Sequence, residues 1–304
     1  MAKVLTAIAF DGDLVLADRI LAFLARIQGE PGSVGEYHPG DFAWQGFRPS
    51  CRTIITAWCA EDGAIMAVSW FMPLREIALT IDPRLVGSGS VSDVIGEMLE
   101  EGLKRHAALG ATERYGLLLR PTDTVIQDVV SALAYRASGE TWFRSNRQAL
   151  DQPIAPRPLA DGFRIVAMDK DADLNERVEV HRDVWHPSRF ALTDYEAIRQ
   201  APLYRADLDL VVQAPDGRYA TSVLGWFDPI SKTGLLEPVG ARADYRRLGL
   251  TVALIGEVLR RMQGLGAEVA LVNSEDDSAA ANALYAAAGF TCATTWQWWA
   301  RPGE

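Results

Sequence analysis

The stretch LLEPVGARADYRRLGLT, residues 235–251, decides the fold. Its apolar beginning, residues 235–240, is typical of a strand, and the chain then turns through three arginines and Gly249. Apolar residues recur at helical spacing from Val252 to Met262, which predicts an amphipathic helix that begins directly after the turn. The sequence therefore predicts a strand, a turn and a helix in immediate succession.

The charge of this segment differs from that of the whole chain. Between Gly240 and Met262 there are five arginines and two acidic residues, whereas the chain has a net charge of −10. The first turn of a helix offers free backbone N–H groups and the positive end of the helix dipole, which suit a phosphate group. The turn is therefore a candidate anion-binding site.

Two parts of the C-terminal half resemble the GNAT acetyltransferases. Arg246-Arg247-Leu248-Gly249-Leu250-Thr251 resembles the family's acyl-CoA-binding turn, Gln/Arg-x-x-Gly-x-Gly/Ala, and departs from it at Thr251. The run NALYAAAGF, residues 282–290, resembles the family's second CoA-contacting helix. The resemblance implies an α/β fold of the α+β type with a mixed sheet, acetyl-CoA as cosubstrate and no metal. It implies cofactor contacts at Val239, Gly240, Ala241, Arg246, Arg247, Leu248, Gly249, Leu250, Thr251 and Asn282, with Arg242 as a further candidate.

Two side chains are candidates for the chemistry. Tyr285 lies one helical turn after Asn282, and a tyrosine at this place in the family protonates the CoA thiolate. Glu237 precedes Pro238, which cannot donate to a sheet, so we expect a bulge or a splayed edge there. A carboxylate at such a splay can serve as general base. The competing interpretations are a tyrosine packed in the core and a glutamate paired with an arginine.

The chain also shows an internal duplication. A segment with three prolines, residues 151–159, separates residues 1–150 from residues 160–304, and the expected order of strands and helices repeats after it. The hairpin signals Glu61-Asp62-Gly63 and Pro215-Asp216-Gly217 mark the same place in each half. We therefore expect two tandem GNAT acyl-CoA acyltransferase lobes joined by a proline-rich linker.

The N-terminal lobe is expected to be degenerate. Superposing Gly89 on Gly249 aligns the apolar positions of the following helices and makes Gly87, Ser88 and Gly89 a possible second CoA site. A competing register places the family pattern on residues 84–89 letter for letter, but puts a serine where the helix should bury an apolar residue. Val130 falls opposite Tyr285, so a proton donor is missing. We expect catalysis in the C-terminal lobe.

Several other residues have two interpretations. His181 and His186 lie on or just after the first helix of the C-terminal half, where the family places its acceptor site, although packing is the commoner role for such histidines. Trp185, Trp226, Trp296, Trp298 and Trp299 can line an acceptor pocket or fill the core. Asp11-Gly12-Asp13 matches the nucleophile loop of haloacid-dehalogenase-type phosphatases, but a turn between strand and helix explains it more simply.

Composition limits the class of function. The 304 residues suffice for two domains, and no apolar run approaches the roughly 18 residues that a membrane span needs. Cys51, Cys59 and Cys292 lack metal-ligand spacing and predict reduced cytoplasmic thiols. A pI of about 5.0 argues against nucleic acid and suits an amine.

Together these features predict an acyl-CoA-dependent N-acetyltransferase for a small-molecule amine, without nucleic-acid or membrane partners and as a monomer or homodimer. The alternative is a non-catalytic acyl-CoA-binding or scaffold protein.

Overall fold

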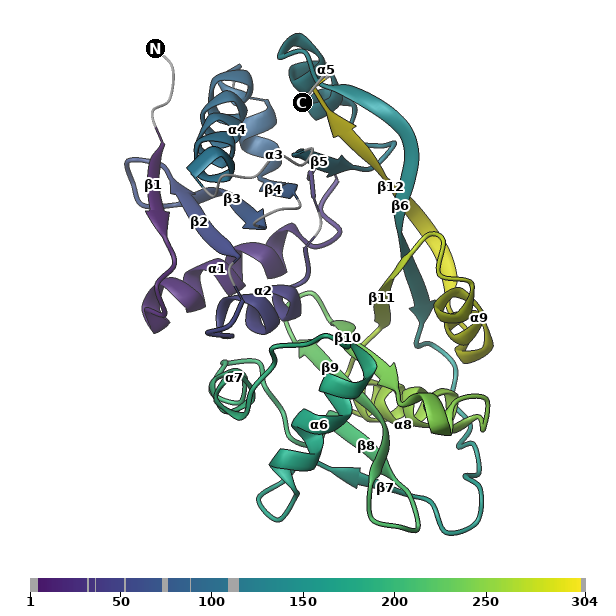
Figure 1. Cartoon of the computed structure of the whole chain (residues 1–304). Coiled ribbons are helices and arrows are strands. Elements are labelled where there is room, and N and C mark those ends of the chain that lie inside the picture. Colours follow the sequence, from purple (N-terminus) through teal and green to yellow (C-terminus); the bar gives the residue numbers. More distant parts are fainter. Residues whose placement is uncertain are drawn as a thin grey trace.

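The computed structural model describes residues 5–31, 33–35, 37–51, 53–72, 76–87, 89–108 and 115–301. The elements of the N-terminal half are β1 Thr6–Ala9, α1 Leu14–Ile27, α2 Pro39–Gly46, β2 Ile54–Cys59, β3 Ile65–Met72, β4 Glu76–Ile81, α3 Pro83–Val86, α4 Val91–Ala108, β5 Gly116–Leu119, α5 Thr124–Ala132 and β6 Arg136–Ala149. Those of the C-terminal half are β7 Arg164–Ala167, α6 Leu174–Val184, α7 Leu192–Ile198, β8 Asp209–Gln213, β9 Tyr219–Asp228, β10 Thr233–Ala241, the 3₁₀ turn η1 Ala243–Tyr245, α8 Leu250–Gly264, β11 Val269–Glu275, α9 Ala279–Ala288 and β12 Thr291–Ala300. The two halves repeat one order of elements, which confirms the predicted duplication (Figure 1).

One mixed sheet runs through both halves. Its strand order is β1-β2-β3-β4-β5-β12-β6-β11-β10-β9-β8-β7. Among the described strands, β4 with β5 and β10 with β11 are parallel pairs, and the other neighbours are antiparallel. Both predicted hairpins form, as β2–β3 and β8–β9. The predicted α/β class with a mixed sheet is confirmed.

The two halves exchange strands at the centre of the sheet. β12 lies between β5 and β6, and β6 lies between β12 and β11 (Figure 1). The sequence predicts strands around Tyr135 and over 141–149, and closing strands over 290–300, but β6 and β12 are each one long strand. β6 of the N-terminal half pairs with β11 and β12, and β12 of the C-terminal half pairs with β5 and β6, so each long strand is added to the sheet of the other half. The boundary between two lobes, which the sequence predicts at residues 151–159, remains a proposal, because one continuous sheet contains strands from both sides of it.

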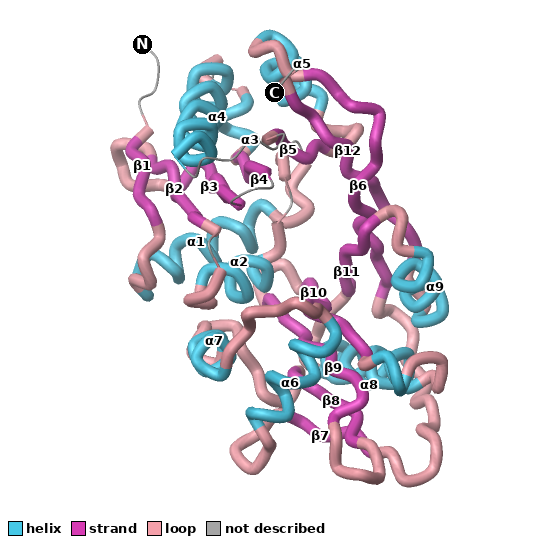
Figure 2. Tube along the Cα trace, viewed as in Figure 1, coloured by secondary structure: helices cyan, strands magenta, loops and turns pink. Residues whose placement is uncertain are grey.

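Helices cover both faces of the sheet, as Figure 2 shows. In the N-terminal half α4 and α5 pack on one face and α1 and α2 on the other; in the C-terminal half α8 and α9 oppose α6 and α7. Helix α7 was not predicted from the sequence. At its start, the Asp194 side chain accepts a hydrogen bond from the Ala191 N–H at 2.8 Å. No helix within the described ranges has the length and apolar character of a membrane span.

Helix α2 joins the two halves. It contacts β9 and β10 of the C-terminal half. A Cβ atom at Gly40 would lie 2.5 Å from the Cβ of Trp226, so this close approach requires glycine. At the start of α2, Nε2 of His38 lies 3.0 Å from Oγ1 of Thr233 on β10. An N-terminal helix is thereby fixed beside the strand that carries Glu237.

Candidate functional site

The parallel strands β10 and β11 separate after a short paired stretch. They pair over residues 233–235 of β10, and beyond that point these two fully described strands no longer pair. On its other edge β10 shifts register against β9 between Leu236 and Val239, which leaves Glu237 and Pro238 in a bulge. The bulge or splayed edge predicted at Pro238 is confirmed.

The Trp226 side chain holds this bulge in place. Its Nε1 donates a hydrogen bond of 2.7 Å to the Glu237 carbonyl oxygen, and the indole is completely buried. Beyond the bulge, Val239, Gly240 and Ala241 pair with β9 along one edge only. Their other edge faces the gap between β10 and β11, so backbone groups there are available to a ligand.

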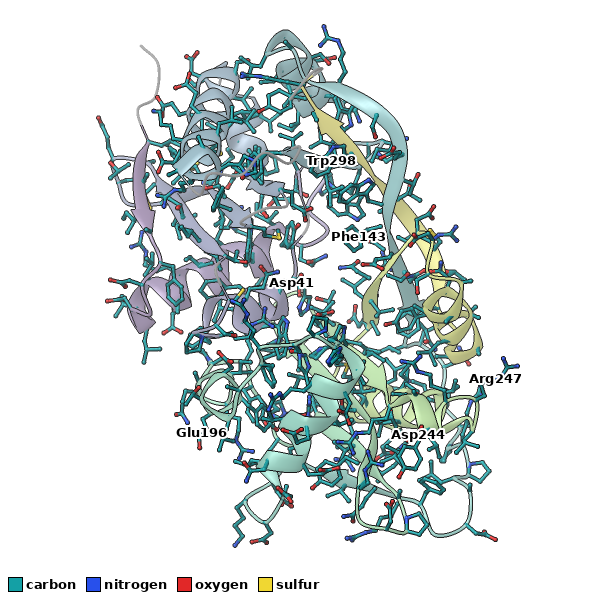
Figure 3. The ribbon with its side chains drawn as sticks, in the orientation of Figure 1. Asp41, Phe143, Glu196, Asp244, Arg247 and Trp298 are labelled. Carbon is teal, nitrogen blue, oxygen red and sulfur yellow. The ribbon has the colours of Figure 1, made fainter. Side chains whose placement is uncertain are left out.

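The predicted anion-binding turn lies at the start of α8. Gly249 caps the helix with a left-handed φ of +75°, and no side chain occupies the cap. Among the described residues no acceptor takes the N–H groups of Leu248, Gly249 or Leu250. Arg246 and Arg247 are exposed, and Figure 3 shows Arg247 extending outward. The turn thus combines free donors with two solvated cations, which suits a diphosphate.

Two neighbouring polar side chains are engaged within the protein. The Thr251 hydroxyl lies 3.1 Å from that of Thr221, which itself donates to the Gly240 carbonyl at 2.7 Å. The Arg242 guanidinium is buried and forms ion pairs with Glu176 at 2.6 Å and Asp183 at 2.7 Å. Arg242 therefore attaches α6 to the end of β10, whereas the sequence offered it as a phosphate contact.

Helix α9 carries the other two candidates. Tyr285 is 6% exposed and its ring meets Phe290 edge-on at 6.1 Å. Burial and the nearby Glu237 charge raise the pKa of the Tyr285 hydroxyl well above its usual range, so it stays protonated. The Asn282 amide accepts from the Ser274 hydroxyl at 2.8 Å and donates to the Asp276 carbonyl at 3.0 Å. These bonds anchor α9 to the end of β11.

Glu237 opens into cavities between the two halves. It lines one cavity of about 680 Å³ and a second of about 210 Å³. Asp41 of α2 lines both, and also a third of about 290 Å³. Phe143 of β6 lines the second cavity, and Figure 3 shows Asp41 and Phe143 together at the centre of the molecule. The candidate site therefore draws residues from both halves of the chain.

The two carboxyl groups have unusual acidities. Burial and the charge of Asp41 raise the pKa of Glu237 to about 7, although the Arg48 guanidinium opposes this shift. Burial raises the pKa of Asp41 to about 7, and the His38 N–H, which donates to its Oδ2 at 2.8 Å, works against the rise. Each group can therefore gain or lose a proton near neutral pH.

Sequence reasoning missed Asp41 and Arg48. Both lie in residues 29–49, for which the sequence predicts a loop with at most a short helix over 37–47, and no motif connects them to Glu237. The His38–Asp41 capping box was a local signal for α2, but it gave no information on what the helix packs against. Of the candidate aromatic residues, Trp185 and Trp296 line cavities, whereas Trp226 and Trp298 are buried in the core.

The last glycine of the N-terminal turn has nearly the same φ as its counterpart, whereas Gly87 has a φ of −77° and Arg247, at the corresponding place, one of +65°. Gly89 has a left-handed φ of +73° before α4, close to that of Gly249 before α8. Ser88 lies outside the described residues. The Asp11-Gly12-Asp13 segment is a helix start, because Oδ1 of Asp13 accepts from the Leu16 N–H at 2.7 Å. Within the described ranges no group of three or more His, Cys, Asp or Glu residues is placed to hold a metal ion.

Comparisons with known proteins support the fold. Residues 175–290 match the model of the acetyltransferase (GNAT) family. A GCN5-related N-acetyltransferase from Sphaerobacter thermophilus is similar in structure, with 19% identity, a TM-score of 0.65, and coverage of 98% of this chain and 97% of that chain. A tandem GNAT protein from the clavulanic acid biosynthesis pathway has 15% identity, a TM-score of 0.68 and 99% coverage of both chains.

An acetyltransferase of the GNAT family from Colwellia psychrerythraea has 12% identity and a TM-score of 0.60, with coverage of 97% of this chain and 99% of that chain. No curated protein matches the chain. The solved structures share the fold over nearly the full length, and the matched family is one of acetyltransferases. Residues 175–290 thus match the GNAT family, and the chain as a whole has the tandem GNAT fold.

Proposed function

We propose that the C-terminal half transfers an acetyl group from acetyl-CoA to the amine of a small molecule. The observation that carries this proposal is Glu237, a carboxyl group in the bulge where β10 leaves β11, open to cavities between the halves. Such a group stands between a cosubstrate in the splay and an acceptor in the cavity. Bound acetyl-CoA supplies the thioester and the thiol leaving group.

The cosubstrate site uses backbone groups first. The N–H groups of Leu248, Gly249 and Leu250 face outward from the first turn of α8 and fit a diphosphate. Arg246 and Arg247 add positive charge beside them. The open edge of Val239–Ala241 offers strand hydrogen bonds to the amide-bearing arm of the cosubstrate.

Glu237 acts as general base. An ammonium group must lose a proton before its nitrogen can attack a carbonyl carbon. A carboxyl group whose pKa is raised to about 7 is a far better proton acceptor at neutral pH than an ordinary glutamate. Glu237 takes this proton directly or through a water molecule in the cavity.

Tyr285 acts as general acid. Its hydroxyl stays protonated because burial and the Glu237 charge raise its pKa. It can then donate a proton to the sulfur as the carbon–sulfur bond breaks. The N-terminal half has Val130 at the corresponding place, so we propose that it supports the site without catalysing the reaction.

The test is an acetylation assay on the full chain. Purified protein is incubated with acetyl-CoA and a panel of small primary amines, and thiol release and the acetylated products are measured. Glu237→Gln keeps the shape but removes the base, so turnover should fall about 100- to 10,000-fold, with the affinity for acetyl-CoA unchanged. If acetyl-CoA binds but no amine is acetylated, the non-catalytic alternative holds.

A further inference from the structure

The large cavity beside Glu237 contains a positive group at its wall. Arg48 follows the end of α2, and its guanidinium lies 4.9 Å from the ring centre of Trp44. Its Nε is buried and has no hydrogen-bond partner among the described residues. Arg48 lines the same cavity of about 680 Å³ as Asp41 and Glu237. The cavity is thus lined by two arginines, Arg48 and Arg189, and by two carboxyl groups.

A second unsatisfied nitrogen belongs to His181, which lines the same cavity. His181 is 6% exposed, its ring lies 5.7 Å from that of Trp44, and it packs against Trp185 at 4.4 Å and Phe190 at 4.2 Å. Nδ1 of His181 is buried without a partner among the described residues. Burial, followed by the charges of Arg177 and Arg48, lowers the pKa of His181 to about 3. The ring is therefore neutral, and one of its nitrogens can donate.

These two nitrogens point to a ligand with acceptor atoms. Buried polar atoms in proteins nearly always have a hydrogen-bond partner, and leaving one without a partner is costly. Arg48 Nε can only donate, and His181 Nδ1 can donate in one tautomer. An oxyanion offers two or more acceptor oxygens and also neutralises the guanidinium. Its size is compatible, because cavities of about 300–1,000 Å³ hold small-molecule ligands.

We propose that the acceptor is a zwitterionic amine, whose anionic group binds at Arg48 and His181 while its amino group lies between Glu237 and Asp41. The chemistry recognised is a primary amine with a carboxylate or a phosphate in the same small molecule. This inference rests on the proposed acetyltransferase function and specifies its substrate class. Trp44, Trp185 and Phe190 enclose the body of the molecule between its two charged ends.

Matched amines test the anionic group. L-Phenylalanine is compared with phenethylamine, which lacks the carboxylate, and with L-phenylalaninamide, which neutralises it; β-alanine and aminoethyl phosphate are compared with propylamine and ethylamine. The amino group of phenethylamine is more basic than that of L-phenylalanine, and the amino group of L-phenylalaninamide is less basic. A preference for L-phenylalanine over both therefore cannot come from the basicity of the amine. The anionic member should have a kcat/KM about 10- to 100-fold higher, as expected for a charge-assisted hydrogen bond. Equal values within every pair would overturn the proposal, and the preferred anion identifies a carboxylate or a phosphate.

Variants of Arg48 test the site. Arg48→Met should remove the preference for anionic amines by raising KM for them. Loss of the guanidinium also lets the pKa of Glu237 rise, which affects both classes of amine alike, so the readout is the ratio of kcat/KM between anionic and neutral amines. Arg48→Lys should restore part of the preference, whereas Arg164→Met, an exposed arginine on β7 outside the cavity, should change neither class. An equal loss for anionic and neutral amines in Arg48→Met would show a merely structural role.

Calorimetry separates this inference from the proposed function. If no amine is acetylated, the catalytic proposal fails. Titration of the same probes into wild type and Arg48→Met still shows whether anionic amines bind through Arg48. If amines are acetylated without regard to their anionic group, the function stands and the substrate class proposed here is wrong.

Discussion

The gap beside the fourth strand is open in the C-terminal half and filled in the N-terminal half. In the C-terminal half β10 leaves β11 and the gap stays open next to Glu237. In the N-terminal half β4 pairs with β5 only at Glu76 and Ile77, and the segment 33–35 then occupies the space. Val34 exchanges backbone hydrogen bonds of 3.3 Å and 3.0 Å with Ile81.

The segment 33–35 is tightly fitted. A Cβ atom at Gly35 would lie 1.6 Å from the Leu79 carbonyl oxygen, and Arg120, directly after β5, donates to the Ser33 carbonyl at 3.2 Å. The segment therefore bridges the ends of both strands. We therefore propose that this segment keeps the arm of an acyl-CoA out of the N-terminal half, even though Gly89 has the left-handed φ of Gly249.

The same comparison shows an ion pair with its charges reversed. Arg242 at the end of β10 pairs with Glu176 and Asp183 of α6, whereas Asp82 at the end of β4 pairs with Arg26 of α1 and with Arg84. Both pairs fix the first helix to the fourth strand. The charges of the two partners can be exchanged, because the contact between helix and strand needs only their mutual attraction.

The largest expected effect concerns acetyl-CoA binding. Gly249→Asp places a carboxylate against the diphosphate and forces a left-handed backbone on a residue with a side chain, so binding should be lost. Gly89→Asp imposes the same backbone strain in the N-terminal half, where the segment 33–35 occupies the gap. This variant should keep its affinity for acetyl-CoA and its turnover within about twofold of wild type. Isothermal titration of acetyl-CoA into both folded variants checks this prediction. Wild type should bind one acetyl-CoA per chain. Loss of turnover in Gly89→Asp alone would reverse the assignment of the two halves.

The next effect concerns the proton donor. Tyr285→Phe keeps the ring and removes the hydroxyl, so kcat should fall about 10- to 1,000-fold while acetyl-CoA affinity holds. Tyr115→Phe is the matched control, because this tyrosine of the N-terminal half is buried and its hydroxyl has no hydrogen-bond partner among the described residues. Single-turnover kinetics separate chemistry from product release. Parental rates in Tyr285→Phe would assign its phenol to packing.

The smallest effect concerns pH. Because Glu237 acts as a base in its ionised form, kcat/KM should rise with pH through about 7. Burial is the main cause of the raised pKa and the Asp41 charge comes second, so Asp41→Asn should move the midpoint to lower pH by about one unit or less. The amide oxygen can still accept from the His38 N–H, which preserves the helix start. A midpoint that stays constant or rises would contradict the coupling of the two carboxyl groups.

The sequence predicted the fold where local signals were strong. Apolar periodicity, the glycine turn and Pro238 indicated the strand, the bulge and the helix that surround Glu237, because each depends on neighbours close in the chain. The segment 33–35 and the Asp41–Glu237 pair could not be predicted in this way. They depend on which distant segments meet, and the sequence around Asp41 predicts a helix start without indicating which strand that helix packs against.

The long strands β6 and β12 also determine how the chain reaches its native state. Leu119 of β5 pairs with Gln297 of β12, and Ser145 of β6 pairs with Asn273 of β11. Residues 5–149 therefore keep an unpaired strand edge during synthesis until the residues near position 300 have left the ribosome. Contacts between such distant segments slow folding and expose a partly formed sheet to aggregation. The halves are thus repeats in sequence but a single cooperative unit in folding, and the interhalf cavity forms only when that unit is complete.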